Sequence, residues 1–250
     1  MLLLPEQIMR LDVYLAENKL VASRTEAKSF ITEGAVKVDG SIITKPSFNV
    51  SEDSHIDIDK TIKKYVSRGG IKLEAAISEF CISVDGRLCL DIGASSGGFT
   101  DCLLQHGASR VISVDSGYGQ IAESLADNPK VTVIENYNAR FMSPSDFEYQ
   151  PTLAVMDVSF ISATYIIPAL SECIADGGSF VCLIKPQFEV GRERIGKGGI
   201  VKDDKTRRLA VEKVKAAAER CGFKFSGLIQ SPITGGDGNI EFLAHFIKGE

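Results

Sequence analysis

From residue 88 onward, short apolar runs alternate with segments of mixed polarity. Five runs have the length and composition of buried strands: LCLDIG (88–93), RVISVD (110–115), VTVIE (131–135), LAVMD (153–157) and FVCLIK (180–185). Segments between them, such as residues 97–107 and 118–127, space their apolar residues as helices do. This alternation predicts an α/β domain built on a parallel sheet.

Two later apolar runs, residues 223–230 and 240–247, are joined by SPITGGDGN. This connection is too short to hold a crossover helix, so we expect the two runs to pair antiparallel at the end of the sheet. A parallel sheet with such a pair resembles the Rossmann-like fold of S-adenosylmethionine-dependent methyltransferases.

Residues 10–59 show a different pattern of predicted helices and strands. RLDVYLAENK (10–19) and SRTEAKSFITEG (23–34) predict two helices, AVKVDGSIITKP (35–46) predicts a hairpin turning at Asp39-Gly40, and HIDID (55–59) predicts a further strand. This small α+β pattern resembles the alpha-L RNA-binding fold. The sequence thus predicts an alpha-L domain over 1–60, a basic linker over 61–66 and a methyltransferase domain over 67–250.

In the alpha-L family the second helix and the hairpin hold the RNA backbone. The resemblance implies phosphate contacts from Arg10, Arg24, Lys28 and Lys37. To these we add Arg68, which lies in a basic stretch at the start of the second domain. Each of these side chains is also consistent with an ordinary surface charge.

The charge distribution separates these regions further. The 250-residue chain has a net charge of −5, which by itself argues against a nucleic-acid partner. However, residues 60–72 hold five bases and no acid, and residues 192–215 hold nine bases against four acids. The two segments are either solvated surfaces or parts of one RNA path.

The sequence favours a cytoplasmic protein without a membrane anchor. The first ten residues, MLLLPEQIMR, lack the basic stretch of a secretory signal, and the apolar segment 152–170 contains Asp157 and Pro168. Six cysteines without a C-x-x-C pair, together with three scattered histidines, predict reduced core thiols and no metal site.

A glycine-rich turn follows the first predicted strand, at LDIGASSGGF (90–99). It does not match the G-x-G-x-x-G pattern of dinucleotide-binding proteins. Its D-x-G-x-x-x-G-G-F pattern resembles the first motif of methyltransferases, whose loop surrounds the methionine part of S-adenosylmethionine. The resemblance implies cofactor contacts from Asp91, Gly93, Ser96, Gly97, Gly98 and Phe99. Asp115, 22 residues after Gly93, is the candidate for the ribose hydroxyls, and Asn138 for the adenine side.

Four charged residues are candidates for catalysis. Asp157 and Lys185 end the fourth and fifth predicted strands, and ligands bind at the carboxyl edge of such sheets. Lys72 lies on a predicted helix in SRGGIKLEA, and Glu241 opens the last strand in GNIEF. This set resembles the K-D-K-E tetrad of ribosomal RNA 2'-O-methyltransferases. The whole chain is similar to the TlyA family, often labelled hemolysin A, in which an alpha-L domain precedes an FtsJ-like methyltransferase domain.

The chemistry of 2'-O-methylation explains such a set. A ribose hydroxyl is a weak acid, and the sulfonium methyl is already electrophilic, so the enzyme must align the two and accept one proton. We assign Lys185 as the base, Asp157 as its orienting partner, and Lys72 and Glu241 as groups that position the hydroxyl. The alternative is four unrelated strand-end charges that form structural ion pairs.

The predicted function is therefore transfer of a methyl group from S-adenosylmethionine to a ribose 2'-hydroxyl of ribosomal RNA, as RNA or within a ribosomal subunit. The resemblance implies a cytidine of the large subunit. The chain ends nine residues after Glu241, without the longer C-terminal helix of some relatives, which leaves the small subunit open. Two other functions stay open: a membrane-damaging hemolysin and a catalytically inactive RNA-binding protein. The sequence does not determine the oligomeric state.

Overall fold

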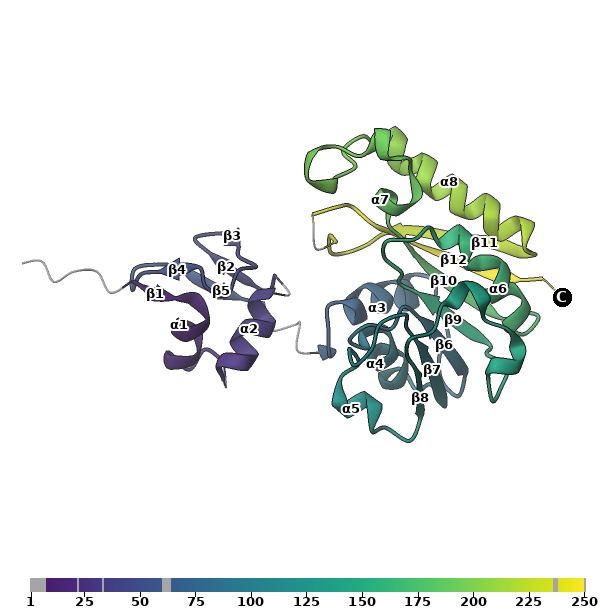
Figure 1. Cartoon of the computed structure of the whole chain (residues 1–250), viewed down its shortest axis with the longest axis horizontal. Coiled ribbons are helices and arrows are strands. Elements are labelled where there is room, and N and C mark those ends of the chain that lie inside the picture. The colour runs from purple at the N-terminus through teal and green to yellow at the C-terminus, as the bar shows by residue number, and fades with distance from the viewer. Residues whose placement is uncertain (1–7, 22, 33, 60–63, 236–237, 250) are drawn as a thin grey trace, which may run out of the picture. The chain divides into compact units, whose positions relative to one another are not determined.

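The chain divides into two compact units, Met1–Lys64 and Tyr65–Glu250 (Figure 1). A computed structural model describes residues 8–249 except 22, 33, 60–63 and 236–237. The predicted basic linker, residues 61–66, includes this unit boundary, and its residues 61–63 lie outside the described part of the chain.

The first unit is a small α+β module, as predicted. Its elements are α1 (Leu11–Glu17), α2 (Arg24–Thr32), the sheet β3 (Ser41–Ile42), β2 (Val36–Val38) and β5 (Ile56–Ile58), and the pair β1 (Met9–Arg10) with β4 (Asn49–Val50). The hairpin turns at Asp39 and Gly40, both at positive φ, as the Asp-Gly signal predicts. Leu11, Leu15 and Ile31 are fully buried in the core of the unit.

The second unit contains a seven-stranded sheet in the order β11-β12-β10-β9-β6-β7-β8. Its strands are β6 (Leu88–Ile92), β7 (Arg110–Val114), β8 (Val131–Ile134), β9 (Leu153–Met156), β10 (Ser179–Ile184), β11 (Phe223–Gln230) and β12 (Phe242–Lys248). Strand β12 runs antiparallel to both β10 and β11, and the other neighbours are parallel. The predicted fold class is confirmed.

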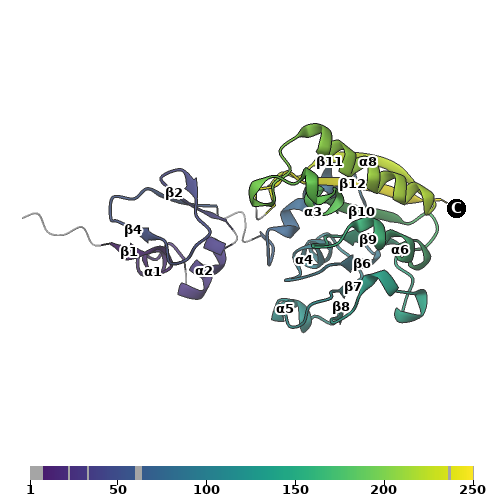
Figure 2. The same ribbon diagram turned by 45° about the horizontal axis from the view of Figure 1, so that its top comes forward.

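Helices cover both faces of this sheet. They are α3 (Gly69–Glu79), α4 (Gly98–Gln105), α5 (Glu123–Ala126), α6 (Ile167–Cys173), α7 (Pro186–Glu189) and α8 (Asp204–Arg220), with short 3-10 turns η2 (Ala139–Phe141), η3 (Pro144–Asp146), η4 (Ala163–Tyr165), η5 (Arg192–Arg194) and η6 (Lys197–Gly199). Residues of α3 and α4 share one apolar cluster with alternate strand residues, and residues of α6 and α8 share the other. Figure 2 shows α8 alongside β11 and β12.

Three expectations differ from the structure. The helix predicted over 118–127 begins only at Glu123, because Gly119 adopts a left-handed φ of 65° and Ala122 N–H turns back to the carbonyl of Ser96. Glu241 precedes β12 rather than opening it. Cys81 is an exposed thiol in a positive-φ turn, whereas Cys89, Cys102, Cys173 and Cys182 are buried.

Within the described ranges, no helix is long and apolar enough to cross a membrane. The described residues also contain no cluster of three or more histidine, cysteine or acidic side chains that could hold a metal ion.

Candidate active site

The candidate catalytic residues gather at one edge of the sheet, and the strand register explains why. Ile184, the last residue of β10, lies opposite Phe242, the first residue of β12. Lys185, which follows β10, and Glu241, which precedes β12, therefore lie at the same edge of the sheet. In parallel strands β6 and β9, Ile92 lies opposite Met156, which places Asp157 beside the glycine-rich turn.

Lys185 and Asp157 form an ion pair, with 2.6 Å between Nζ and Oδ1. Lys185 Nζ also donates a hydrogen bond of 2.7 Å to Ser159 Oγ. The two charged side chains are 12% and 21% exposed, so the pair is largely withdrawn from water but not sealed. The amine therefore keeps some contact with solvent.

Lys72 and Glu241 form a second pair, with 2.6 Å between Nζ and Oε2. Lys72 lies on α3, and Glu241 lies at the amino end of β12. Their side chains are 10% and 2% exposed, which makes this the more deeply buried of the two pairs. The carboxylate and the ammonium each compensate for the lost hydration of the other.

A pocket of about 530 Å³ opens beside Asp157. Three predicted cofactor residues line it: Gly93, Asp115 and Asn138. Asp115 accepts hydrogen bonds from the backbone N–H of Ser95 at 2.8 Å and of Gly117 at 2.7 Å, which fixes its carboxylate at the pocket wall.

Asn138 also has a defined orientation. Its Oδ1 caps η2 by accepting a hydrogen bond from the Arg140 N–H at 3.1 Å. Several other lining residues are not among the predicted site residues: Ser95, Gly117, Gln120, Tyr137, Ser159 and Phe160. Phe160 carried a usable sequence signal, because it is an aromatic residue three positions after the strand-ending Asp157. In the structure its side chain is 92% exposed.

The other predicted cofactor residues are not among those that line the pocket. Gly98 packs so closely against the start of α3 that an added Cβ would lie 2.2 Å from Ser67 Oγ, and an added Cβ at Gly97 would lie 2.3 Å from Leu125 Cδ1. Phe99 is a core residue. Ser96 contributes its carbonyl to the loop by accepting from Ala122 N–H.

Asp91 is fully buried beneath the same turn. Its Oδ2 accepts a hydrogen bond of 2.7 Å from Thr100 Oγ1, and its Oδ1 has no hydrogen-bond partner among the described residues. Burial raises the pKa of this carboxyl to about 7. Asp91, Gly97, Gly98 and Phe99 are therefore buried within the loop, Ser96 is partly exposed, and contact with a cofactor stays a prediction for each.

In the first unit, two candidate RNA residues share one buried carboxylate. Arg10 Nε lies 2.9 Å from Asp12 Oδ1, and Arg24 Nε lies 3.0 Å from Asp12 Oδ2. Their guanidinium groups lower the pKa of Asp12 to about 2, Arg10 having the larger effect. Both arginine side chains are about half exposed, at 46% and 53%. The structure holds them in fixed positions at the surface of this unit.

The other candidate RNA residues differ in setting. Lys28 and Lys37 are exposed, on α2 and β2, and Arg68 is the N-cap residue of α3. In the basic segment 60–72, residues 60–63 lie outside the described part of the chain.

The second basic segment is anchored close to Glu241. Asn239 is 1% exposed, its Nδ2 donates to the Gly199 carbonyl at 3.0 Å, and its Oδ1 accepts from Val201 N–H at 3.0 Å. Because Asn239 lies two residues before Glu241, it fixes the basic loop beside the candidate catalytic edge.

The chain matches two protein families. The FtsJ-like methyltransferase family matches residues 65–248, and the S4 domain family matches residues 9–56. These matched ranges correspond to the two units of the structure.

Individual relatives are similar over most of the chain. The 16S/23S rRNA (cytidine-2'-O)-methyltransferase TlyA of Mycobacterium tuberculosis is 41% identical over 93% of this chain and 87% of its own. A solved structure from Streptococcus thermophilus, named as a hemolysin, is 43% identical, covers 97% of this chain and 89% of that one, and has a TM-score of 0.78. An S-adenosylmethionine-dependent methyltransferase from Mesorhizobium loti shares the fold at 18% identity, with a TM-score of 0.52 over 70% of this chain and 96% of that one.

Proposed function

We propose that this chain, which belongs to the FtsJ-like methyltransferase family and to its TlyA group with an S4 domain, methylates a ribose 2'-hydroxyl of ribosomal RNA. The methyl donor is S-adenosylmethionine. The observation that carries the proposal is the position of the Lys185–Asp157 pair at the wall of the Asp115 pocket. A proton acceptor and a cofactor-sized pocket thus meet at one edge of the sheet.

The pocket residues fit the proposed cofactor. A volume of about 530 Å³ lies within the range of about 300 to 1,000 Å³ common for small-molecule sites. The Asp115 carboxylate lies at the pocket wall and suits ribose hydroxyls, and Asn138 would contact the adenine. Gly93 leaves room for the Asp157 backbone, because an added Cβ would lie 2.3 Å from the Asp157 carbonyl oxygen. S-adenosylmethionine, when bound, supplies an electrophilic methyl group.

The side chains at the edge supply the remaining requirements of the reaction. An uncharged Lys185 amine accepts the proton of the ribose hydroxyl, and hydrogen bonds from Nζ to Asp157 and Ser159 hold it in place. Once the amine is protonated, its contact with Asp157 is the ion pair seen in the structure. Lys72 of α3 and Glu241, which directly precedes the neighbouring strand β12, form a buried charged pair that orients the hydroxyl. This division of roles is part of the proposal.

The RNA part of the proposal follows from the S4 unit and the relatives. The Mycobacterium tuberculosis relative is named for cytidine in 16S and 23S rRNA, so we propose a cytidine in ribosomal RNA, with the large subunit as the first candidate. Arg10, Arg24, Lys28, Lys37 and Arg68 are the proposed phosphate contacts. A ribosomal RNA substrate implies a cytoplasmic location.

Mapping of 2'-O-methyl groups tests this proposal directly. Ribosomal RNA from cells that lack the gene should lose one or a few methylated riboses, and the wild-type gene should restore them whereas a Lys185→Ala variant should not. An unchanged methylation map would contradict the proposal. Leakage of liposomes after addition of the purified protein would favour the hemolysin alternative instead.

A further inference from the structure

A second pocket, of about 890 Å³, lies next to the first in the same unit. The two share Phe160 and Ile161 as a common wall. The first pocket contains Asp157 and Ser159, and the second is formed by the segment around η4, by α7 and by η5. Only the shared wall of Phe160 and Ile161 would therefore separate a ligand in the second pocket from the pocket beside the candidate catalytic pair.

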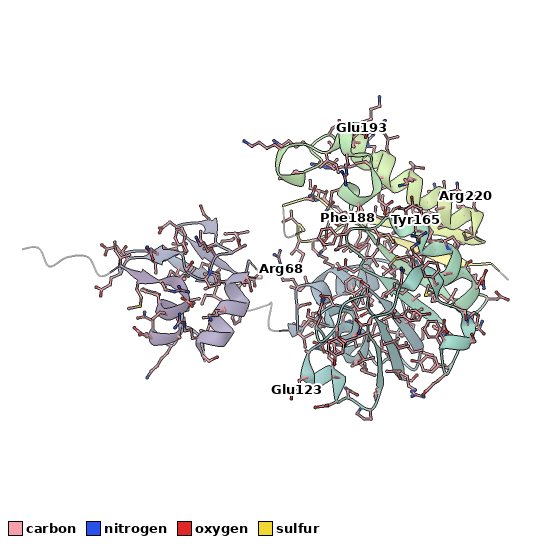
Figure 3. All side chains as sticks on the ribbon, in the orientation of Figure 1. Arg68, Glu123, Tyr165, Phe188, Glu193 and Arg220 are labelled. Carbon is pink, nitrogen blue, oxygen red and sulfur yellow. The ribbon has the colours of Figure 1, made fainter. Side chains whose placement is uncertain are left out.

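Aromatic rings line this second pocket. Tyr165 is 58% exposed, and the guanidinium of Arg140 lies over its ring at 5.0 Å. Phe188 packs against Phe160, with 5.2 Å between the ring centroids and an angle of 52° between the planes. Figure 3 labels Tyr165 and Phe188, which come from η4 and α7. The exposed ring of Tyr165 and the half-buried ring of Phe188 offer flat faces for stacking a nucleobase.

The charges of the pocket favour an anionic ligand. Its one carboxylate, Glu189, is 5% exposed and is already satisfied: it accepts hydrogen bonds from Ser162 Oγ and Ala163 N–H and lies 3.5 Å from Lys213 Nζ. By contrast, Arg140 and Arg192 are exposed and make no ion pair with any residue that the structure describes.

A polar atom in the wall supports a ligand with hydrogen-bond donors. Gln187 lines the pocket, and its buried Oε1 accepts no hydrogen bond within the described part of the chain. A buried acceptor without a partner is unfavourable, and an amino group of a nucleobase could satisfy it after a small rotation of the amide.

We propose that this pocket binds an unpaired nucleotide of the RNA that is adjacent in sequence to the one whose ribose reacts. Its base stacks on Tyr165 and Phe188, and its phosphate contacts Arg140 and Arg192. The inference rests on the proposed function, because the reacting ribose is placed at Lys185 on the other side of Phe160. The pocket would thus select the sequence or the unpaired state of the neighbouring position.

Cross-linking of the full-length protein tests the inference. In a Tyr165→p-benzoylphenylalanine variant, irradiation with substrate RNA should produce a cross-link one or two nucleotides from the methylated ribose. A cross-link on the methylated nucleotide itself, or none to RNA, would overturn the inference. Methylation by the unsubstituted protein is measured in parallel, and its complete absence would reject the proposed function rather than the pocket alone.

Kinetics give a second readout. Tyr165→Ala should raise the KM for RNA by about 5- to 100-fold, the range expected for loss of a stacked base, while S-adenosylmethionine affinity stays unchanged. Arg192→Gln should also raise the KM for RNA, because it removes a phosphate contact. Tyr165→Phe should restore the wild-type KM because it keeps the ring. Arg220→Gln, at the end of α8 (Figure 3), is the matched control. An unchanged KM in both test variants would overturn the inference.

Discussion

At the residue scale, the structure explains why a buried strand ends in a lysine. All six residues of β10 are buried, and Lys185 follows them with a side chain that is only 12% exposed. An ammonium group this far withdrawn from water is unfavourable unless it is paired. Asp157 and Ser159 provide the partners, and both come from the end of the adjacent strand. The pairing explains how the lysine is tolerated, and the adjoining pocket suggests why it is there.

Lys185→Arg separates a catalytic role from a purely electrostatic one. Arginine keeps the positive charge beside Asp157 but does not release its proton in a protein, so we expect methyl transfer to fall to background. Single-turnover transfer of a labelled methyl group measures the effect, and calorimetry with S-adenosylmethionine should give an unchanged affinity. Lys205→Arg, on the exposed start of α8, is the control. Retention of most activity by Lys185→Arg would remove Lys185 as the base.

The Lys72–Glu241 pair calls for a different test because it is more deeply buried. Lys72→Met leaves Glu241 as an uncompensated buried charge and should lower the free energy of unfolding by about 3–5 kcal/mol. The double variant Lys72→Met/Glu241→Leu should recover most of that stability without recovering activity. Urea unfolding and methyl transfer measure the two effects. Arg110→Ala breaks an exposed ion pair and should cost less than about 1 kcal/mol. If the double variant is active, the Lys72–Glu241 pair has a purely structural role.

The buried carboxyl of Asp91 predicts a pH dependence of stability. Its pKa of about 7 lies above the ordinary value of 3.8, so between these values the folded protein keeps a proton that the unfolded chain has released. Wild-type stability should therefore fall, relative to an Asp91→Asn variant, as the pH rises from 4 to 7, by up to about 4 kcal/mol. Urea unfolding of both proteins across this range measures the difference. Parallel curves would show that Asp91 titrates normally.

At the element scale, the strands were predictable and several connections were not. Buried parallel strands are continuous apolar runs, so β6 to β10 could be located from composition alone. The helix α8 was missed because most of its residues are charged and its buried positions are mainly alanine and valine. Residues 118–122 were misassigned because tertiary hydrogen bonding overrides their helical spacing.

Some residues of the candidate site could likewise be predicted from the sequence, and others could not. The residues at strand ends, Asp115, Asp157 and Lys185, could be placed at one edge from topology. The contribution of Ser159, and the positions of Gly97 and Phe99 outside the pocket lining, depend on loop conformation and side-chain packing, which no local pattern encodes.

The turn after β6 can be tested as an element. Gly93 has a φ of 83°, and an added Cβ would lie 2.3 Å from the Asp157 carbonyl oxygen. Gly93→Ala should therefore displace the end of β9 and weaken both cofactor binding and methyl transfer. The left-handed backbone at this position should also lower the free energy of unfolding by about 1–2 kcal/mol. Gly177→Ala, with a φ of 70° and no atom within 4 Å of the added Cβ, carries only the backbone penalty and should remain active. Equal activity in the two variants would contradict this account.

At the scale of the whole molecule, the proposed catalytic groups and the proposed RNA-binding cluster lie in different units. The proposed cofactor and proton-accepting groups lie in the unit that begins at Tyr65, and the Arg10–Asp12–Arg24 cluster lies in the other. The net charge of −5 hides this division, because acids are concentrated between residues 73 and 191, whereas bases gather in the flanking segments. RNA binding and cofactor binding should accordingly respond to separate substitutions.

The salt dependence of RNA binding measures this separation. Arg24→Gln combined with Lys28→Gln should remove two phosphate contacts and reduce the slope of log affinity against log salt by about 1.4 to 1.8. S-adenosylmethionine affinity should not change, because the pocket residues Gly93, Asp115 and Asn138 all belong to the second unit. Lys130→Gln is the matched control, since Lys130 precedes β8 at the sheet edge opposite the candidate site and should leave the slope as it is. If the double variant keeps the wild-type slope, Arg24 and Lys28 are surface charges, and the RNA contacts of the S4 unit must be sought on another of its faces.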